Sequence, residues 1–231
     1  MRTATAGIPS GPARARPCPR LVAVSDEARL VRADALARVE ALARARCPAI
    51  LLRPGSMAIR RFYDFARWAR DVCRAAAVEL WIGDHADVAV AIGADAVQLP
   101  ARGLSIAGAR RVVGEEIRVG RSVHGASEAA RAALDSADHV ILGAIYATAS
   151  HPTIDPARPT LVAAARAATA EHPIPILAIG GMTPERATEV ITAGAWGVAA
   201  LTALWDADDP AAAVSTFLDA LSGDAPSRAL H

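Results

Sequence analysis

One histidine lies where it could transfer protons. Side chains along residues 118–124 should alternate between the two faces of an expected strand, so that Gly120, Ser122 and His124 share one face. Because Gly120 and Ser122 are small, this face leaves room for a ligand beside the imidazole. An imidazole titrates near neutral pH and therefore suits general acid–base catalysis. A histidine here could instead cap the strand end or pack beneath a loop. We take His124 as the candidate catalytic residue.

A pair of glycines could bind an anion. Gly180 and Gly181 follow one apolar segment, and Leu201 and Thr202 close the next. Glycines let backbone N–H groups approach an anion, and the Thr-Pro pair at 183–184 is typical of a helix start, whose positive end would face it. Alternatively, the glycines only make a tight turn and the threonine only caps the helix. We predict a phosphate site at these four residues.

Three other polar residues are candidates for binding anionic groups of a ligand. Arg53 closes a short apolar segment that indicates a buried strand, and an unpaired buried cation is costly. Its partner could be a carboxylate or phosphate of the substrate, or equally an internal aspartate. The hydroxyls of Thr148 and Ser150 could also bind anionic oxygens, or they could be ordinary loop residues. We predict all three as substrate-binding residues.

These residues follow short apolar segments that alternate with amphipathic ones. Apolar residues such as Val31, Leu36, Val39 and Leu42 recur at helical spacing between the segments. Eight such repeats predict one α/β domain, a (β/α)₈ TIM barrel over residues 20–223, with its site at the C-terminal ends of the strands. Residues 1–19 are expected to be a disordered leader and residues 224–231 a tail. The expected strands are residues 21–24, 49–52, 79–82, 96–99, 118–122, 139–143, 175–179 and 197–201.

The composition excludes several classes of protein. A net charge of +1 and 4% aromatic residues do not favour nucleic-acid binding, and no apolar run is long enough to span a membrane. The absence of lysine excludes Schiff-base catalysis. Three cysteines without a CxxC pair, and histidines without HxxxH spacing, predict neither disulfides nor a metal site. We expect a cytoplasmic protein that needs no metal or cofactor.

Several of these segments resemble the thiamine phosphate synthase/TenI family. Residues 178–184 and 193–199 resemble the family, and the Gly-Arg-Ser-Val-His run at 120–124 and the Val-Gln-Leu-Pro run at 97–100 resemble its TenI branch, the thiazole tautomerases. The resemblance extends from about Leu21 to Leu221. It implies that the second glycine of the pair and the backbone at 201–202 hold a thiazole phosphate, and that His124 transfers the proton. Dimers or larger assemblies are common in the family.

The chain departs from the synthase pattern where that pattern binds Mg²⁺ and pyrophosphate. Of the family's Gln-x-Arg-x-Lys motif at a strand end, this chain keeps only Arg53, and of the family's Asn-Asp-Arg turn it keeps only Asp84. A second metal-binding aspartate of the family is absent here, and His151 stands where the family has a loop lysine. We therefore expect a TenI-like isomerase that aromatises a thiazole carboxylate phosphate by proton transfer. The alternatives are a divergent thiamine phosphate synthase that uses Asp84 for its metal, and a non-catalytic regulator that binds thiazole phosphate.

Overall fold

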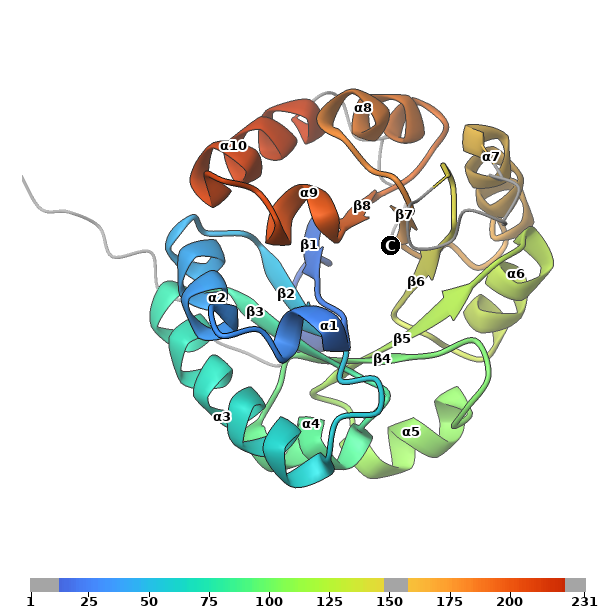
Figure 1. Cartoon of the computed structure of the whole chain (residues 1–231). Helices are drawn as coiled ribbons and strands as arrows, with labels where there is room; N and C mark the ends of the chain where they lie inside the picture. Colours follow the sequence, from blue (N-terminus) through green and yellow to red (C-terminus); the bar gives the residue numbers. More distant parts are fainter. Residues whose placement is uncertain (1–12, 148–157, 223–231) are drawn as a thin grey trace, which may run out of the picture.

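The computed structural model describes residues 13–147 and 158–222. Its strands form a closed parallel barrel in chain order, with β8 paired to β1 (Figure 1). This confirms the predicted (β/α)₈ TIM barrel, and each predicted strand boundary lies within one residue of the observed one. The strands are β1 (Leu21–Val24), β2 (Ala49–Leu52), β3 (Glu79–Gly83), β4 (Ala96–Leu99), β5 (Arg118–Val123), β6 (His139–Leu142), β7 (Ile176–Ile179) and β8 (Gly197–Ala200).

Helices surround the ring of strands, and two short ones, α1 and α9, lie inside the outer ring of helices (Figure 1). Both have four residues, too few to produce a helical period, and the sequence did not predict them. The helices are α1 (Glu27–Leu30), α2 (Ala35–Arg44), α3 (Ile59–Ala76), α4 (Ala86–Ile92), α5 (Ile106–Val113), α6 (Ala126–Leu134), α7 (Arg158–Ala168), α8 (Pro184–Thr192), α9 (Thr202–Trp205) and α10 (Pro210–Leu221).

One predicted helical face is wrong in part. Val39 and Leu42 are fully buried, but Val31 is 45% exposed and Leu36 is 46% exposed. Val31 is the C-cap residue that follows α1, and a turn separates it from the start of α2 at Ala35. The four positions therefore do not form one continuous apolar stripe.

The apolar core has two parts, because strand side chains alternate between the inside and the outside of the barrel. The inner cluster includes Val22, Leu51, Trp81 and Leu177 and fills the barrel interior. The outer cluster joins the other strand faces, such as Leu21, to the helices. Trp81 is completely buried in the inner cluster. The interior is thus packed, which leaves the ends of the strands as the place for a site.

The N-terminal end of the barrel is closed by residues 13–19, part of the segment assigned from sequence to a disordered leader. Arg16 bonds to Asp95 at 2.7 Å, and the guanidinium of Arg118 donates to the carbonyl oxygen of Arg16 at 2.6 Å. Arg118 also pairs with Glu79 at 2.6 Å. Because Glu79 and Arg118 are the first residues of β3 and β5, these contacts lie at the floor of the barrel.

Two further findings concern the described part of the chain. None of its helices combines the length and apolar character that crossing a membrane requires. Cys18, Cys47 and Cys73 are buried free thiols. Burial raises the pKa of each to about 12, so none is a reactive thiolate near neutral pH.

Candidate functional site

The glycine pair follows β7 at the mouth of the barrel. Gly180 has φ of +104° and Gly181 has φ of +60°, backbone conformations that favour glycine. A Cβ atom on Gly180 would lie 2.8 Å from Cβ of Ala144, and one on Gly181 would lie 2.7 Å from the carbonyl oxygen of Ala147. Both glycines therefore have a structural reason to be present, in addition to any contact with an anion.

Helix α8 begins directly after the glycines, as predicted. Thr183 caps it by accepting a hydrogen bond from the backbone N–H of Arg186 at 3.4 Å, and Pro184 is its first residue. The Arg186 side chain returns to the glycine turn and donates to the carbonyl oxygen of Gly181 at 2.5 Å. The capping role of Thr183 and the phosphate role of the turn are thus compatible.

Arg186 and Tyr146 also join α8 to the loop after β6. The guanidinium lies 4.6 Å from the centroid of the Tyr146 ring, and the Tyr146 hydroxyl donates to Glu189 at 2.6 Å. Burial, followed by that hydrogen bond, raises the pKa of Tyr146 to about 12. Sequence reasoning missed both residues, because no local pattern relates two side chains so far apart in the chain.

Leu201 and Thr202 lie beside the glycines, because β7 and β8 are neighbouring strands. Leu201 precedes α9 and Thr202 begins it, so the first backbone N–H groups of α9 have no partner within the helix. Loops after the seventh and eighth strands, next to a short extra helix, are the usual phosphate site of this fold. The structure therefore brings together the four residues predicted to bind phosphate.

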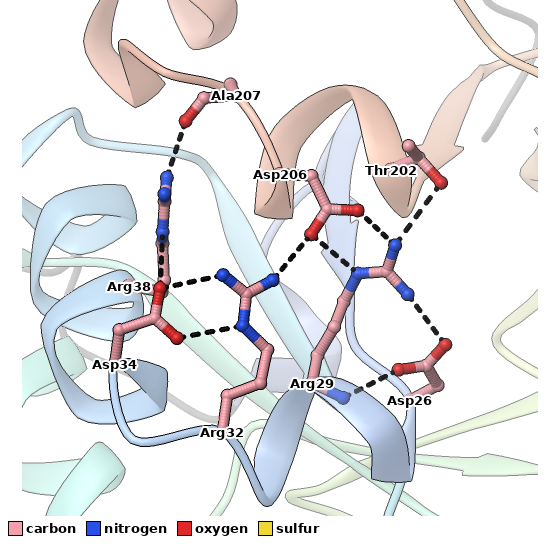
Figure 2. Close-up of polar contacts among 8 residues, drawn as sticks. All are labelled: Asp26, Arg29, Arg32, Asp34, Arg38, Thr202, Asp206 and Ala207. Carbon is pink, nitrogen blue, oxygen red and sulfur yellow. Dashed lines mark hydrogen bonds and ion pairs between the residues drawn. The ribbon is translucent and has the colours of Figure 1, made fainter.

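Arg29 connects α1 to α9 next to Thr202 (Figure 2). Its guanidinium donates to Oγ1 of Thr202 at 3.4 Å and to Asp26 at 2.8 Å, and it pairs with both carboxylate oxygens of Asp206. The side chain of Arg29 is only 15% exposed. This arginine, which sequence reasoning also missed, positions one side of the candidate phosphate site.

A wider network extends from Asp206 to α2 (Figure 2). Arg32 bonds to Asp206 at 3.0 Å and to Asp34 at 2.8 Å. Arg38 bonds to Asp34 at 3.3 Å and donates to the carbonyl oxygen of Ala207 at 2.5 Å. The segments that follow β1 and β8 are therefore held to one another by several ion pairs.

His124 directly follows β5 and is exposed at the mouth. Its backbone N–H donates to Glu128 at 2.7 Å, and its Nδ1 lies 2.7 Å from the carbonyl oxygen of Gly143. Since a carbonyl can only accept, Nδ1 carries the hydrogen, and Nε2 of the neutral ring is unprotonated. No hydrogen bond among the described residues uses Nε2. His124 therefore has the tautomer that a general base needs.

Gly120 and Ser122 lie on one face of β5, since both are next to Gln98, but the space beside Gly120 is not free for a ligand. A Cβ atom there would lie 2.2 Å from Oε1 of Gln98 and from Nε2 of His139. These two buried side chains occupy the space. Room for a ligand on this face therefore begins above Gly120, at the level of Ser122 and His124.

The interpretation of Arg53 as a buried strand residue is wrong. Strand β2 ends at Leu52, and Arg53 is exposed. Its aliphatic part lies against the end of β3, where Cγ would be 3.2 Å from a Cβ atom on Gly83. No carboxylate in the described parts of the chain pairs with its guanidinium. The described residues therefore do not support the alternative in which the partner of Arg53 is an internal aspartate. Together with Asp26 and Glu27, Arg53 lines an open hollow of about 570 Å³.

Thr148 and Ser150, with His151, lie outside the described residues. The flanks of their segment are described: the backbone N–H of Arg158 donates to the carbonyl oxygen of Ile145 at 2.8 Å. The backbone N–H of Tyr146 donates to the carbonyl oxygen of Gly180 at 3.2 Å. The described residues on one side of the segment therefore lie beside the glycine turn, and those on its other side contact them.

The donor set for a divalent cation is small. Asp84 is an exposed residue after β3 with φ of +65°, and its Oδ1 would lie 3.7 Å from a Cβ atom on Gly103. Within residues 13–147 and 158–222, no group of three or more His, Cys, Asp or Glu side chains could hold a metal ion. Mg²⁺ takes six oxygen ligands and usually combines one or two carboxylates with phosphates of its ligand. A single Asp84 is a poor fit to the paired aspartates of the synthase pattern.

Comparison with known proteins identifies the family. A model described as thiamine monophosphate synthase matches residues 21–204. The thiamine-phosphate synthase of Natronomonas pharaonis is 38% identical over 192 residues, which are 81% of this chain and 88% of that protein. The bifunctional thiamine biosynthesis protein ThiM/ThiE of Symbiobacterium thermophilum is 37% identical over 183 residues; these are 78% of this chain but only 37% of that protein.

Comparison with a solved structure supports the same family. The thiamine phosphate pyrophosphorylase from Pyrococcus furiosus has a TM-score of 0.75 and 25% identity, and the match covers 87% of this chain and 95% of that one. The Natronomonas pharaonis relative carries the name of the synthase, and none of the three names mentions TenI, so the comparisons support the family and not the narrower TenI branch. The barrel, the matched residues and the relatives agree that the chain belongs to the thiamine monophosphate synthase/TenI family of thiamine biosynthesis enzymes.

Proposed function

We propose that this protein is a TenI-like thiazole tautomerase, an isomerase that aromatises a thiazole carboxylate phosphate by moving one proton. The observation that carries the proposal is the hydrogen bond between Nδ1 of His124 and the carbonyl oxygen of Gly143. It keeps the proton on Nδ1 and leaves Nε2 as the base. His124 accepts a proton from the thiazole precursor at Nε2 and returns it elsewhere on the ring, so the reaction consumes no cofactor.

The remaining residues bind the substrate. The phosphate lies at Gly180, Gly181, Leu201 and Thr202, which follow the neighbouring strands β7 and β8. The carboxylate is near Arg53, whose guanidinium forms no ion pair within the described residues, or near the hydroxyls in the loop after β6. A positive charge without an internal partner at the mouth of the barrel favours an anionic ligand.

A second candidate is a thiamine-phosphate synthase, which the names of the relatives favour over the tautomerase. The chain's own side chains argue against it. It retains one aspartate of the metal pattern and lacks the lysines of the pyrophosphate site. A third candidate, a non-catalytic regulator, would keep the phosphate site without turnover.

Two assays on one preparation separate these candidates. With thiazole phosphate, the pyrimidine pyrophosphate and Mg²⁺, we expect no thiamine phosphate, whereas a synthase would form it at about 1 s⁻¹ or faster. With the thiazole carboxylate phosphate precursor, we expect isomerisation that is insensitive to a chelator of divalent cations. Synthesis of thiamine phosphate would establish the second candidate. Tight binding of thiazole phosphate with neither reaction would establish the regulator.

A further inference from the structure

The two carbonyl oxygens of the glycine turn after β7 are held by one cluster of residues. The carbonyl oxygen of Gly180 accepts a hydrogen bond from the backbone N–H of Tyr146 at 3.2 Å. The carbonyl oxygen of Gly181 accepts a hydrogen bond from the guanidinium of Arg186 at 2.5 Å. That guanidinium lies 4.6 Å from the centroid of the Tyr146 ring. Because Tyr146 follows β6, the cluster lies on the side of the turn that faces the loop after β6.

The N–H groups of the same two peptide units point the other way. In a trans peptide unit the N–H group is antiparallel to the carbonyl group, and both peptide bonds of the turn are trans. The carbonyl of Gly180 therefore directs the N–H of Gly181 away from the cluster, and the carbonyl of Gly181 directs the N–H of Met182 away from it. Since β7 lies between β6 and β8, the side away from the cluster is that of β8, where Leu201 and Thr202 lie.

Both N–H groups are available to a ligand. No hydrogen bond in the described parts of the chain uses the N–H of Gly181 or of Met182. The Met182 side chain is only 5% exposed and packs in the outer apolar cluster, which fixes the position of its backbone. Successive N–H groups that point to one side form a concave site for an anion. The turn therefore offers a second backbone donor, at Met182, beside the one at Gly181.

We propose that Arg186 is a positioning residue of the phosphate site: by holding the carbonyl oxygen of Gly181, it aims the N–H of Met182 at the phosphate. The ring of Tyr146 holds the guanidinium in that place. Arg186 acts through one peptide unit and not by touching the ligand. The inference rests on the phosphate site of the proposed function, and it applies equally to the synthase and the regulator, which would use the same site.

The N–H of Gly181 supplies an internal reference, because its direction depends on the backbone of Tyr146 and not on Arg186. The test is NMR of the nitrogen-15-labelled protein saturated with thiazole phosphate. In the parent, the amide protons of Gly181 and Met182 should both move downfield, since each donates to a charged acceptor. In Arg186→Met, Gly181 should still move and Met182 should not.

The same spectra distinguish failure of the inference from failure of the proposed function. A Met182 amide that moves as far in Arg186→Met as in the parent, or that does not move in the parent while Gly181 does, would overturn the role of Arg186 and leave the phosphate site in place. A parent that does not bind thiazole phosphate, or whose two amides both stay unchanged on binding, would contradict the phosphate site and the inference with it.

Affinities supply a second readout. Arg186→Met should weaken thiazole phosphate about tenfold, the lower end for one hydrogen bond to a charged group, and change the thiazole alcohol without phosphate less than about twofold. Arg186→Lys keeps a donor and should recover part of the loss. The matched control is Arg20→Met: Arg20 donates to the carbonyl oxygen of Trp196 at 3.0 Å and lies 6.0 Å from that ring, but it precedes β1, at the other end of the barrel. It should change neither ligand, and equal losses for the two ligands in Arg186→Met would contradict the inference.

Two variants of Tyr146 test how the guanidinium is held. Tyr146→Phe keeps the ring and removes only the hydroxyl that donates to Glu189, so thiazole phosphate affinity should change less than about twofold. Tyr146→Leu removes the ring and leaves the charge of Arg186 in place. Its affinity should fall about two- to fivefold, the range for a cation–π contact at an exposed site. Equal affinities of the phenylalanine and leucine variants would contradict the role of the ring.

Discussion

Nδ1 of His124 lies 2.7 Å from the carbonyl oxygen of Gly143, so backbone from the end of β6 sets the tautomer of a side chain at the end of β5. The two strand ends are themselves joined, because the backbone N–H of Gly143 donates to the carbonyl oxygen of Val123 at 3.1 Å. The imidazole is therefore oriented by the barrel itself, without an acidic side chain on Nδ1.

Gly181→Asp should abolish binding of phosphorylated thiazoles. The new carboxylate would lie where the phosphate binds, and like charges about 4 Å apart near a protein surface repel by several kcal/mol. Calorimetry with thiazole phosphate should detect no binding.

The matched control for this variant is Gly114→Asp. Gly114 also has positive φ, +69°, and a Cβ atom there would have no neighbour within 4 Å. The substitution likewise places a side chain at positive φ and adds a negative charge, but away from the site, at the end of α5. Phosphate affinity should be unchanged. If Gly181→Asp folds and binds as tightly as Gly114→Asp, the phosphate site lies elsewhere.

Arg29→Met should lower the free energy of unfolding by about 1–2 kcal/mol, because it leaves the carboxylates of Asp26 and Asp206 without their mostly buried partner. It should also weaken thiazole phosphate binding several-fold, since Arg29 holds Thr202. Arg44→Met is the control: Arg44 is 71% exposed and its one ion pair among the described residues is with Glu40 at 3.4 Å, so the loss should stay below about 0.5 kcal/mol. Equal urea-unfolding curves for the two variants would contradict the role of Arg29.

His139 predicts a specific dependence of stability on pH. Its pKa is about 3 in the folded protein and about 6.5 in the unfolded chain, so between these values only the unfolded state binds the proton. The residue therefore lowers the free energy of unfolding as the pH falls below about 6.5, by up to about 1.4 kcal/mol per pH unit. His139→Phe should remove this contribution and flatten the slope between about pH 6.5 and 5. Parallel slopes for parent and variant would show that His139 titrates normally.

Most of the strands could be predicted from the sequence because they are short, largely apolar and buried segments, such as residues 21–24 and 49–52. The position of the site followed from the fold, since strand ends converge at one end of a parallel barrel. The environment of Arg53 could not be predicted, because one residue decides whether a side chain lies in the strand or beyond it. The contact between His139 and Gln98 could not be predicted, because these residues belong to β6 and β4 and meet only across the intervening strand β5.

Proton exchange at the thiazole precursor, followed by NMR in D₂O, tests the central claim that His124 is the acid–base of a tautomerase. His124→Gln keeps a neutral hydrogen-bonding side chain but cannot exchange a proton near neutral pH. We predict exchange and isomerisation by the parent, a loss in kcat of about 10² to 10⁴ in the variant, and little change in thiazole phosphate affinity. His172→Gln, an exposed histidine before β7, should behave as the parent does. A His124→Gln variant that isomerises the precursor as fast as the parent, or a parent that shows no exchange, would contradict the account.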